Sequence, residues 1–305
     1  MKTQTFYSNG KLLITGEYVV LDGAKALALP TKFGQNLVVT SGINHQIKWT
    51  SFDADKSIWF QDTLSFSEIK NKYISEKNHD VKNTLIEILH QATIQNPTIL
   101  NEQGFEIETH LTFPRNWGLG TSSTLINNIA QWFKVDAFEL LRKSFGGSGY
   151  DIACAQSSTP IIYHLENEIP NYTSVLFNPT FKDQIYFVYL NQKQSSKLAI
   201  ANYMSKQQHV NTMISKINTI THETINCKEG AAFAKLMEQH EIIMSDVLEL
   251  ETIQEKLFPD FNGVIKSLGA WGGDFIMVIS KDNPEKYFID RGYLVILKYA
   301  DVVFH

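Results

Sequence analysis

A glycine-rich stretch followed by hydroxyl residues, 117–124 (Trp-Gly-Leu-Gly-Thr-Ser-Ser-Thr), carries the clearest chemistry in this sequence. Its glycines, Gly118 and Gly120, allow the backbone to come close to an anion. The hydroxyl side chains could cap a helix or reach a metal ion. An apolar run with helical spacing follows, so unpaired amide N–H groups and the positive end of a helix dipole would point to one place. The stretch predicts a phosphate site, although taken alone it also fits an ordinary helix start.

The elements around this stretch fall into a β-rich first third and a largely helical second half. Alternation and β-branched content predict early strands at 11–15, 26–29, 36–40, 46–50, 58–61 and 105–111, and helical spacing predicts a helix over 83–95. Further helices are expected at 137–144, from about 150, and near 196–206, 209–225, 229–248, 254–268 and Pro284, with strands at 160–164, 184–190, 275–279 and 293–297.

The order of these elements predicts an α+β protein with two lobes. A shift in composition near residues 166–180 indicates the boundary between them. We therefore expect an N-terminal lobe over 1–170, which would carry the phosphate-binding loop, and a C-terminal α+β lobe over 171–305.

Composition and charge exclude several classes of partner. The net charge of −5 argues against nucleic acid or an anionic membrane as the main partner. The two cysteines, Cys154 and Cys227, have neither metal-binding nor regular disulfide spacing, which favours a reducing compartment. The N-terminus lacks the apolar core of a signal peptide, and no apolar run approaches the roughly 20 residues of a membrane span. We expect a cytoplasmic monomer or homodimer that acts on a small molecule.

Three glycine-bearing blocks occur in one order along the chain: 9–21 (NGKLLITGEYVVL), 114–123 (PRNWGLGTSS) and 267–274 (SLGAWGGD). Together they resemble the three signatures of the GHMP small-molecule kinases, the family of galactokinase and of homoserine, mevalonate and phosphomevalonate kinases. The string Gly-Tyr-Asp-Ile-Ala at 149–153 is similar to the hallmark of the GYDIA subgroup of that family. The resemblance implies an N-terminal lobe like domain 2 of ribosomal protein S5, a ferredoxin-like C-terminal lobe, and ATP bound between them.

The resemblance assigns the nucleotide to the second block. The residues that would bind its phosphates are Gly118, Leu119, Gly120, Thr121, Ser122 and Ser123. The hydroxyl of Ser122 would also reach Mg²⁺. Because Mg²⁺ usually takes a carboxylate as well, Glu139 is the candidate second ligand by its position. The alternative is that Glu139 is a solvated helix carboxylate.

The resemblance also implies two catalytic residues. Asp151 lies in a glycine turn that opens a helix, similar to the family's Ser-Gly-x-Asp element, where a carboxylate can accept or orient the proton of the acceptor hydroxyl. Its other possible role is to stabilise the helix N-terminus. Lys11 matches the lysine of the first block, and its ammonium group could favour the ionised form of Asp151 or of the acceptor hydroxyl. A surface lysine at a strand end is the alternative.

Several features bear on the acceptor. Glu17 falls at the acidic position of the first block, followed by Tyr18 where mevalonate kinases often carry histidine, and both Tyr18 and the Gly-Gly-Asp at 272–274 are more similar to phosphomevalonate kinases. The segment 190–197 is similar to the acceptor-facing segment of mevalonate-pathway kinases, although its lysines also fit a solvated helix start. The acceptor residues implied are Glu17, Tyr18, Ser148, Lys193, Ser195, Ser196, Lys197, Ala270 and Gly272. The resemblance favours phosphomevalonate of the isoprenoid pathway, with mevalonate or another GHMP acceptor next.

Two departures from the family pattern leave alternatives open. Trp271 replaces a glycine of the third block, and its indole either packs under the turn or fills space that a ligand uses elsewhere in the family. Arg115, before the second block, could clamp a phosphate or lie at the surface. Trp271 keeps a non-catalytic ligand sensor as a rival function. A decarboxylase of the same fold is the other rival, although it would lack the role of Lys11 and differ around Asp151.

Other enzyme classes are disfavoured by missing residues. The His-Glu pairs at His222 and His240 lack the second histidine of a zinc HExxH helix, because Asn226 and Met244 stand there. The phosphate turn lacks the Gly-Lys-Ser/Thr ending of a Walker loop, the first block lacks a Rossmann GxGxxG, and no GxSxG elbow is present.

Overall fold

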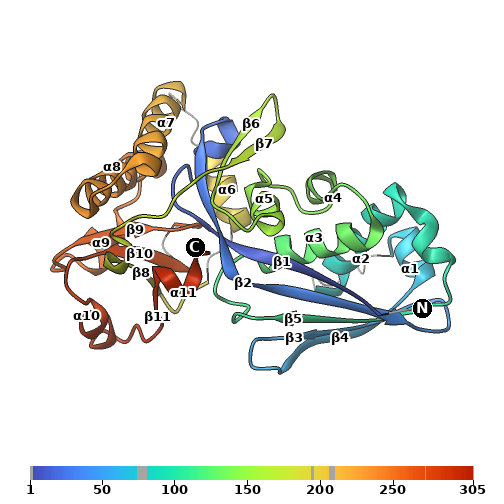
Figure 1. Cartoon of the computed structure of the whole chain (residues 1–305). Helices are drawn as coiled ribbons and strands as arrows, with labels where there is room; N and C mark the ends of the chain where they lie inside the picture. The colour runs from blue at the N-terminus through green and yellow to red at the C-terminus, as the bar shows by residue number, and fades with distance from the viewer. Residues whose placement is uncertain (1–2, 74–80, 194–195, 206–209, 272, 305) are drawn as a thin grey trace. The chain divides into compact units, whose positions relative to one another are not determined.

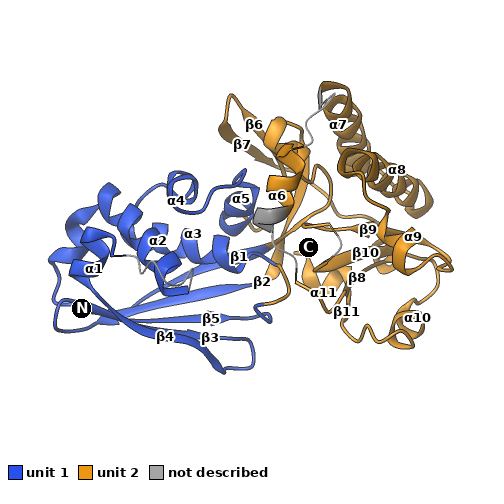
Figure 2. Ribbon diagram, turned by 180° about the vertical axis from the view of Figure 1, so that it is seen from behind, with its two compact units in different colours: residues 1–10, 33–115, 119–156 blue, residues 11–32, 116–118, 157–305 orange. Residues whose placement is uncertain are grey.

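The computed structural model describes residues 3–73, 81–193, 196–205, 210–271 and 273–304, and the chain forms two compact units (Figures 1 and 2). Unit 1 comprises Met1–Gly10, Phe33–Arg115 and Leu119–Gln156, and unit 2 comprises Lys11–Lys32, Asn116–Gly118 and Ser157–His305. The chain passes from one unit to the other within two long strands, at both ends of the segment Asn116–Gly118 in the glycine loop, and after Gln156. The lobes expected at 1–170 and 171–305 stay a prediction.

Unit 1 is a sheet with helices on one face. Its strands come from β1 (Gln4–Leu13), β2 (Ala26–Ser41), β3 (Gln46–Phe52), β4 (Ile58–Ser65) and β5 (Phe105–Leu111). Its helices are α1 (Phe66–Asn71), α2 (Val81–Gln95), the short η2 (Pro97–Asn101), α3 (Thr121–Phe133), α4 (Ala137–Ser144) and α5 (Tyr150–Gln156). Strand β3 lies between β4, which is antiparallel to it, and β5, which is parallel. A parallel neighbour needs a long connection, which α1 and α2 provide.

The core of unit 1 lies between the sheet and the helices above it (Figure 1). Alternate residues of the strands, such as Trp49 on β3 and Ile107 on β5, point to the same side and are buried against the helices. Helix α3 contributes Ile126 and Phe133 to this core. The apolar face that the sequence predicted for this helix therefore fixes its position over the sheet.

Unit 2 contains a β-hairpin and a second sheet. The hairpin of β6 (Ile161–Glu166) and β7 (Ile169–Ser174) pairs with the first residues of β2. The second sheet has the antiparallel order β11-β8-β10-β9, formed by Ile296–Lys298, Ile185–Tyr189, Phe275–Ile279 and Val264–Ser267. Its helices are η1 (Val19–Asp22), η3 (Lys182–Gln184), α6 (Ser196–Ser205), α7 (Val210–Asn226), α8 (Gly230–Leu248), α9 (Ile253–Leu257), α10 (Glu285–Ile289) and α11 (Tyr299–Val302). Helix α8 packs on β9, and α7 packs on α8.

One predicted helix is wrong. The segment 254–268 contains the short helix α9, which ends at Leu257, and the strand β9, which begins at Val264. Pro259 lies two residues beyond the end of α9, where it prevents the helix from continuing. Residues Val264–Ser267 instead pair with β10, a contact that the local pattern does not reveal. The prediction also lacked β7, which occupies the segment assigned to a domain boundary.

The strands expected at 26–29 and 36–40 are a single strand, β2. Gly34 lies within it, and a Cβ atom at that position would be 2.3 Å from the carbonyl oxygen of Ser8 on β1. The glycine interrupts the sequence pattern because the two backbones approach each other there, and the strand itself continues.

Across the part of the chain that the structure describes, no helix has both the length and the apolar character needed to cross a bilayer.

Candidate functional site

The N-terminus of α3 in unit 1 is open to an anion. Gly120 immediately precedes the helix with a φ of 98°, and neither a capping side chain nor an acidic residue occupies the first turn. The hydroxyls of Ser123 and Thr124 donate to the Gly120 carbonyl over 2.9 and 3.0 Å. These bonds hold the loop against the helix while the first-turn amides still point outward along the axis. The arrangement suits a phosphate group.

A buried polar network fixes α3 at that position. Ser8 on β1 donates to Asn128 over 2.8 Å and accepts from Asn127 over 2.8 Å. Asn128 also donates to the backbone oxygen of Gln35 over 2.9 Å, and Gln156 of α5 donates to Asn127 over 2.9 Å. The network joins α3 to β1, β2 and α5. The sequence analysis missed it, although two asparagines inside an apolar helical run were a usable signal.

The predicted base, Asp151, lies in the first turn of α5, which packs against α3. Its side chain is half-buried and accepts from the amide of Ile152 over 3.1 Å. The glycine turn before it has positive φ angles at Gly146, Gly147 and Gly149 and contains Ser148, which is almost fully buried. The glycines therefore shape the turn that presents Asp151.

The predicted metal ligands differ in their surroundings. Ser122 is exposed at the first turn of α3, where its oxygen is accessible. Glu139 is in the first turn of α4, and its carboxylate lies 2.6 Å from the ammonium group of Lys143. Among the described residues, no three His, Cys, Asp or Glu side chains gather as a metal site. Glu139 as a magnesium ligand stays a prediction.

In unit 2, Gly118 lies between Lys11 and Asp274. The ammonium group of Lys11 donates to the Gly118 carbonyl over 2.8 Å. Gly118 has a φ of +68°, and a Cβ atom there would lie 2.4 Å from Cγ of Asp274. Asp274 is buried, and its backbone is held by Leu190 and Gln192 after β8, over 2.8 and 2.7 Å. The glycine loop is thus held from two sides, by a residue of the first block and by one of the third.

Aromatic side chains hold the residues just before Gly118. Trp117 contacts Phe275 edge to face, with ring centroids 5.4 Å apart. The hydroxyl of Tyr189 donates to the carbonyl of Asn116 over 3.1 Å. In unit 1, the guanidinium of Arg115 lies over the ring of Trp59 at 5.3 Å and near Asp53. Arg115 as a phosphate clamp stays a prediction.

Tyr18, a predicted acceptor residue, and Trp271 are in direct contact. The Tyr18 hydroxyl accepts from the Trp271 amide over 2.9 Å, and burial raises the pKa of Tyr18. Tyr18 has a φ of 61°, an uncommon value for a residue with a side chain. The Trp271 indole donates to the carbonyl of Glu251 over 3.3 Å and packs against the Tyr18 cluster. Whether the indole also fills space that a ligand uses in related kinases stays a prediction.

Glu17 is buried instead of open to solvent. Its carboxylate is bonded to the ammonium group of Lys266 on β9, and both residues are almost completely inaccessible. Lys266 also donates to the carbonyl of Ser267 over 2.9 Å. Burial raises the pKa of Glu17 to about 7, although the charge of Lys266 opposes the shift. Sequence reasoning did not single out Lys266, whose neighbours in the chain carry no motif for a buried cation.

Helix α8 completes this buried group with His240 and Glu241. The Nε2 atom of His240 accepts from the Gly16 amide over 2.9 Å, and burial lowers the pKa of this imidazole well below its usual value. Glu241 accepts from the amide and the hydroxyl of Ser267, over 3.1 and 2.8 Å. The first and third glycine blocks are therefore joined through side chains of α8 and β9.

The remaining predicted acceptor residues are only partly covered by the structure. Ala270 is buried in the turn before β10, and Lys193 is exposed after β8. Ser195 and Gly272 lie outside the described residues. The backbone of Ser196 and Lys197 starts α6, but their side chains lie outside the description.

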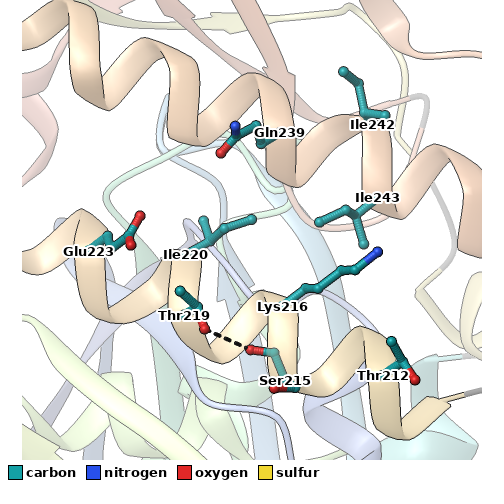
Figure 3. A pocket seen from close by; sticks show the side chains of 9 residues that line it. All are labelled: Thr212, Ser215, Lys216, Thr219, Ile220, Glu223, Gln239, Ile242 and Ile243. Atoms are coloured by element: carbon teal, nitrogen blue, oxygen red, sulfur yellow. Dashed lines mark hydrogen bonds between the residues drawn. The ribbon is translucent and has the colours of Figure 1, made fainter.

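A groove of about 510 Å³ lies between α7 and α8 (Figure 3). The residues that line it are Thr212, Ser215, Lys216, Thr219, Ile220, Glu223, Gln239, Ile242 and Ile243. None of them was predicted as a site residue, and the groove contains neither a glycine loop nor a cluster of carboxylates.

No family model and no curated protein matches the sequence. Solved structures of small-molecule kinases nevertheless share its fold over the whole chain. The mevalonate kinase of Methanococcus jannaschii has a TM-score of 0.72 at 14% identity, covering 100% of this chain and 99% of that one. The phosphomevalonate kinase of Streptococcus pneumoniae, solved with phosphomevalonate and AMPPNP, has a TM-score of 0.71 at 14% identity, covering 97% and 99%. The galactokinase of Lactococcus lactis, solved with galactose, has a TM-score of 0.70 at 13% identity, covering 99% and 94%. The chain has the α+β GHMP kinase fold.

Replacing Gly118 by alanine should destabilise the protein, because the new Cβ atom would overlap the buried Asp274 carboxylate. The matched control is Gly292→Ala, where φ is +87° and a Cβ atom meets nothing within 4 Å. The control isolates the cost of a left-handed backbone, about 1–2 kcal/mol. We expect Gly118→Ala to lose about 1–3 kcal/mol more in the free energy of unfolding, measured in urea. Equal losses in the two variants would contradict the contact.

Replacing Lys266 by methionine should cost about 3–5 kcal/mol in the free energy of unfolding, because two buried carboxylates lose their cation. The double variant Lys266→Met/Glu17→Gln should recover part of that loss, since one of the two carboxylates is then neutral. Lys235→Met, at an exposed position of α8, is the control. Urea denaturation would measure all of these variants, and a Lys266→Met loss no larger than the control's would argue against the buried ion pair.

Proposed function

We propose that this protein is an ATP- and Mg²⁺-dependent kinase that phosphorylates a hydroxyl group of a small anionic metabolite, with phosphomevalonate as the favoured acceptor. The observation that carries the proposal is the uncapped N-terminus of α3 behind two glycines with positive φ angles. The fold shared with small-molecule kinases supports it, and one of those structures holds both phosphomevalonate and AMPPNP.

The backbone of the glycine loop would bind the nucleotide phosphates. The amides of Gly120, Thr121, Ser122 and Ser123 lie where the positive end of the α3 dipole favours negative charge. This environment would stabilise the charge that builds up on the phosphate oxygens during transfer. The ammonium group of Lys11, held on the Gly118 carbonyl, would add a positive charge at the same loop.

The accessible oxygen of Ser122 fits the need of Mg²⁺ for hard oxygen ligands. Glu139 would serve as the carboxylate ligand if it exchanged its partner Lys143 for the metal. Bound Mg²⁺ would neutralise charge on the phosphates. Because this ion keeps several water ligands, two protein oxygens suffice.

Asp151 would accept the proton of the acceptor hydroxyl as the hydroxyl oxygen bonds to the γ-phosphorus. The bond between that phosphorus and the oxygen bridging to the β-phosphate breaks, and ADP is the leaving group. A carboxylate at a glycine turn can present an oxygen without a bulky neighbour in the way. Most of the rate would come from positioning and charge stabilisation, with a smaller part from proton transfer.

The acceptor is proposed to contact Tyr18, Ser148 and Ala270. Lys193, Ser195, Ser196, Lys197 and Gly272 are proposed to complete its binding, with the lysines matching an acceptor that already carries a phosphate. The carboxylate of Glu17 is buried and bonded to Lys266, so Glu17 would affect the acceptor through the neighbouring Tyr18.

Asp151→Asn should fold and bind ATP normally but lose about 10²–10⁴ in kcat, the usual contribution of a general base. Lys11→Met should lower kcat by a similar factor. Asp246→Asn, at an exposed position of α8, is the control for the loss of a carboxylate. A coupled ADP-release assay gives kcat, and calorimetry gives ATP affinity. An Asp151→Asn enzyme with normal kcat would refute the assignment of the base.

The acceptor can be identified by ADP release with mevalonate, phosphomevalonate, homoserine and simple sugars. We expect the highest kcat/KM with phosphomevalonate. Turnover restricted to mevalonate or another of these compounds would show that this compound, and not phosphomevalonate, is the acceptor. ATP binding without turnover on any of them would favour a non-catalytic ligand sensor, the alternative that the packing of Trp271 against Tyr18 leaves open.

A further inference from the structure

A buried cluster of four ionisable side chains lies beneath Tyr18, and the proposed phosphoryl transfer does not use it directly. The cluster consists of Glu17, Lys266 of β9, and His240 and Glu241 of α8. Each residue is at most 3% exposed. Burying such groups is costly unless their charges and hydrogen bonds balance, so the arrangement of protons in this cluster is constrained by its geometry.

The contact between Glu17 and His240 lacks a proton that could form a hydrogen bond between the two side chains. The Nε2 atom of His240 accepts from the Gly16 amide over 2.9 Å, which makes it an unprotonated nitrogen. The Oε2 atom of Glu17 lies 3.3 Å from the same nitrogen, and no donor within the described residues reaches that buried oxygen. Two lone pairs therefore face each other. A proton on Oε2 would turn this repulsion into a hydrogen bond, in which the single lone pair of Nε2 is shared between the Glu17 hydroxyl and the Gly16 amide.

The charge of the cluster also requires one proton. Among the residues that the structure describes, Lys266 is the one cation beside Glu17 and Glu241, so the cluster carries one net negative charge when both carboxylates are ionised and His240 is neutral. Glu241 receives two hydrogen bonds from Ser267, which favour its ionised form. Glu17 is the better place for the proton, because its second oxygen has no donor. The raised pKa of Glu17, about 7, agrees with this assignment.

The titratable groups that face Glu17 come from two elements and from its own loop. Lys266 on β9 favours the carboxylate, whereas Glu241 on α8 disfavours it. His240 on α8 is neutral, because burial and Lys266 both lower its pKa. The neighbouring Tyr18 is also neutral, with a raised pKa. None of these groups replaces the missing proton on Glu17.

The cluster holds both partners of the Tyr18–Trp271 contact. Glu17 directly precedes Tyr18, whose φ of 61° has to be maintained by its surroundings. Ser267, bonded to Lys266 and Glu241, begins the turn that leads to Trp271. Tyr18 and the Trp271 amide are then joined by the 2.9 Å hydrogen bond. A change in the charge of the cluster therefore acts on both ends of this contact.

We propose that Glu17 and His240 hold one proton between them at neutral pH, and that this proton positions Tyr18 and the turn at 267–271. Glu17 is thus a positioning residue that acts through Tyr18. Loss of the proton at higher pH leaves an unbalanced buried charge and loosens the Tyr18–Trp271 contact. The effect on the acceptor rests on the proposed kinase function, whereas the shared proton does not.

The proton is tested first without any substrate. In the full-length protein with ¹³C-labelled glutamate side chains, the carboxyl resonance that disappears in Glu17→Gln belongs to Glu17. We expect it to titrate near pH 7. In His240→Gln the introduced side-chain amide can accept from the Gly16 N–H and donate to Oε2 of Glu17. The titration midpoint of Glu17 should therefore fall by at least one pH unit. Titration of Glu17 at the ordinary value for glutamate in the wild-type protein would overturn the proposal.

Stability provides an independent measure of the same proton. Because the native pKa of Glu17 lies above its unfolded value, wild-type stability relative to Glu17→Gln should be greatest below about pH 4.5. That advantage should be lost as the pH rises through 7. The control Glu238→Gln, at an exposed position of α8, should show no such trend. A difference between wild type and Glu17→Gln that does not vary with pH would contradict the raised affinity for a proton.

The positioning role is tested by the acceptor KM and by the fluorescence of Trp271, obtained by subtracting the spectrum of Trp271→Phe. In the wild type, KM should rise by up to about tenfold per pH unit above 7, the limit for one proton, and the Trp271 emission should change with the same midpoint. In Glu17→Gln, whose side-chain amide can donate to His240 at any pH, the KM and the Trp271 emission should no longer vary with pH above 7.

These measurements separate the inference from the proposed function. If Glu17 titrates near pH 7 and Trp271 emission follows it, but no acceptor is turned over, the kinase proposal fails and the shared proton stands. If Trp271 emission and KM vary with pH in Glu17→Gln as they do in the wild type, the proton does not position the turn, and that part of the proposal is wrong.

Discussion

The close approach of the Asp274 carboxylate to Gly118, which leaves no room for a Cβ atom, is the constraint on which the glycine loop depends. A glycine is required there for two reasons, a left-handed backbone and the lack of room for any side chain. The carbonyl of the same residue is held by Lys11. Since Gly118 immediately precedes the residues that lead into α3, its placement sets where the loop can present its amide groups.

The buried charges of unit 2 serve a related purpose. An ion pair such as Lys266–Glu17 adds little net stability, because desolvation offsets the attraction. Its value lies in joining segments that are far apart in the chain: the first glycine block, strand β9 and helix α8. Because His240 is neutral, the cluster has two carboxyl groups for one cation, which makes its proton content sensitive to pH. A structural junction of this kind can therefore also affect the neighbouring Tyr18–Trp271 contact.

In unit 1, neutral polar groups join segments that are far apart in the chain. Two asparagines of α3 are bonded to Ser8 on β1 and to Gln156 on α5, in surroundings where an unpaired amide would be costly. These bonds fix the rotation of α3 about its axis more closely than its apolar face could. They also connect the helix whose N-terminus is proposed to bind phosphate with the helix that carries Asp151.

The sequence by itself determined the features that depend on neighbouring residues. Periodicity predicted α4, β5 and β10 at their observed bounds, and the spacing of Gly118 and Gly120 predicted the turn before α3. The segment 254–268 was misassigned, because the pairing of β9 with β10 leaves no trace in a local pattern. Only the tertiary structure placed Asp274 on Gly118, and only it bonded Glu17 to Lys266, 249 residues away. Helical spacing and turn chemistry act over a few residues, whereas the partner of a buried charge is decided by how distant segments pack.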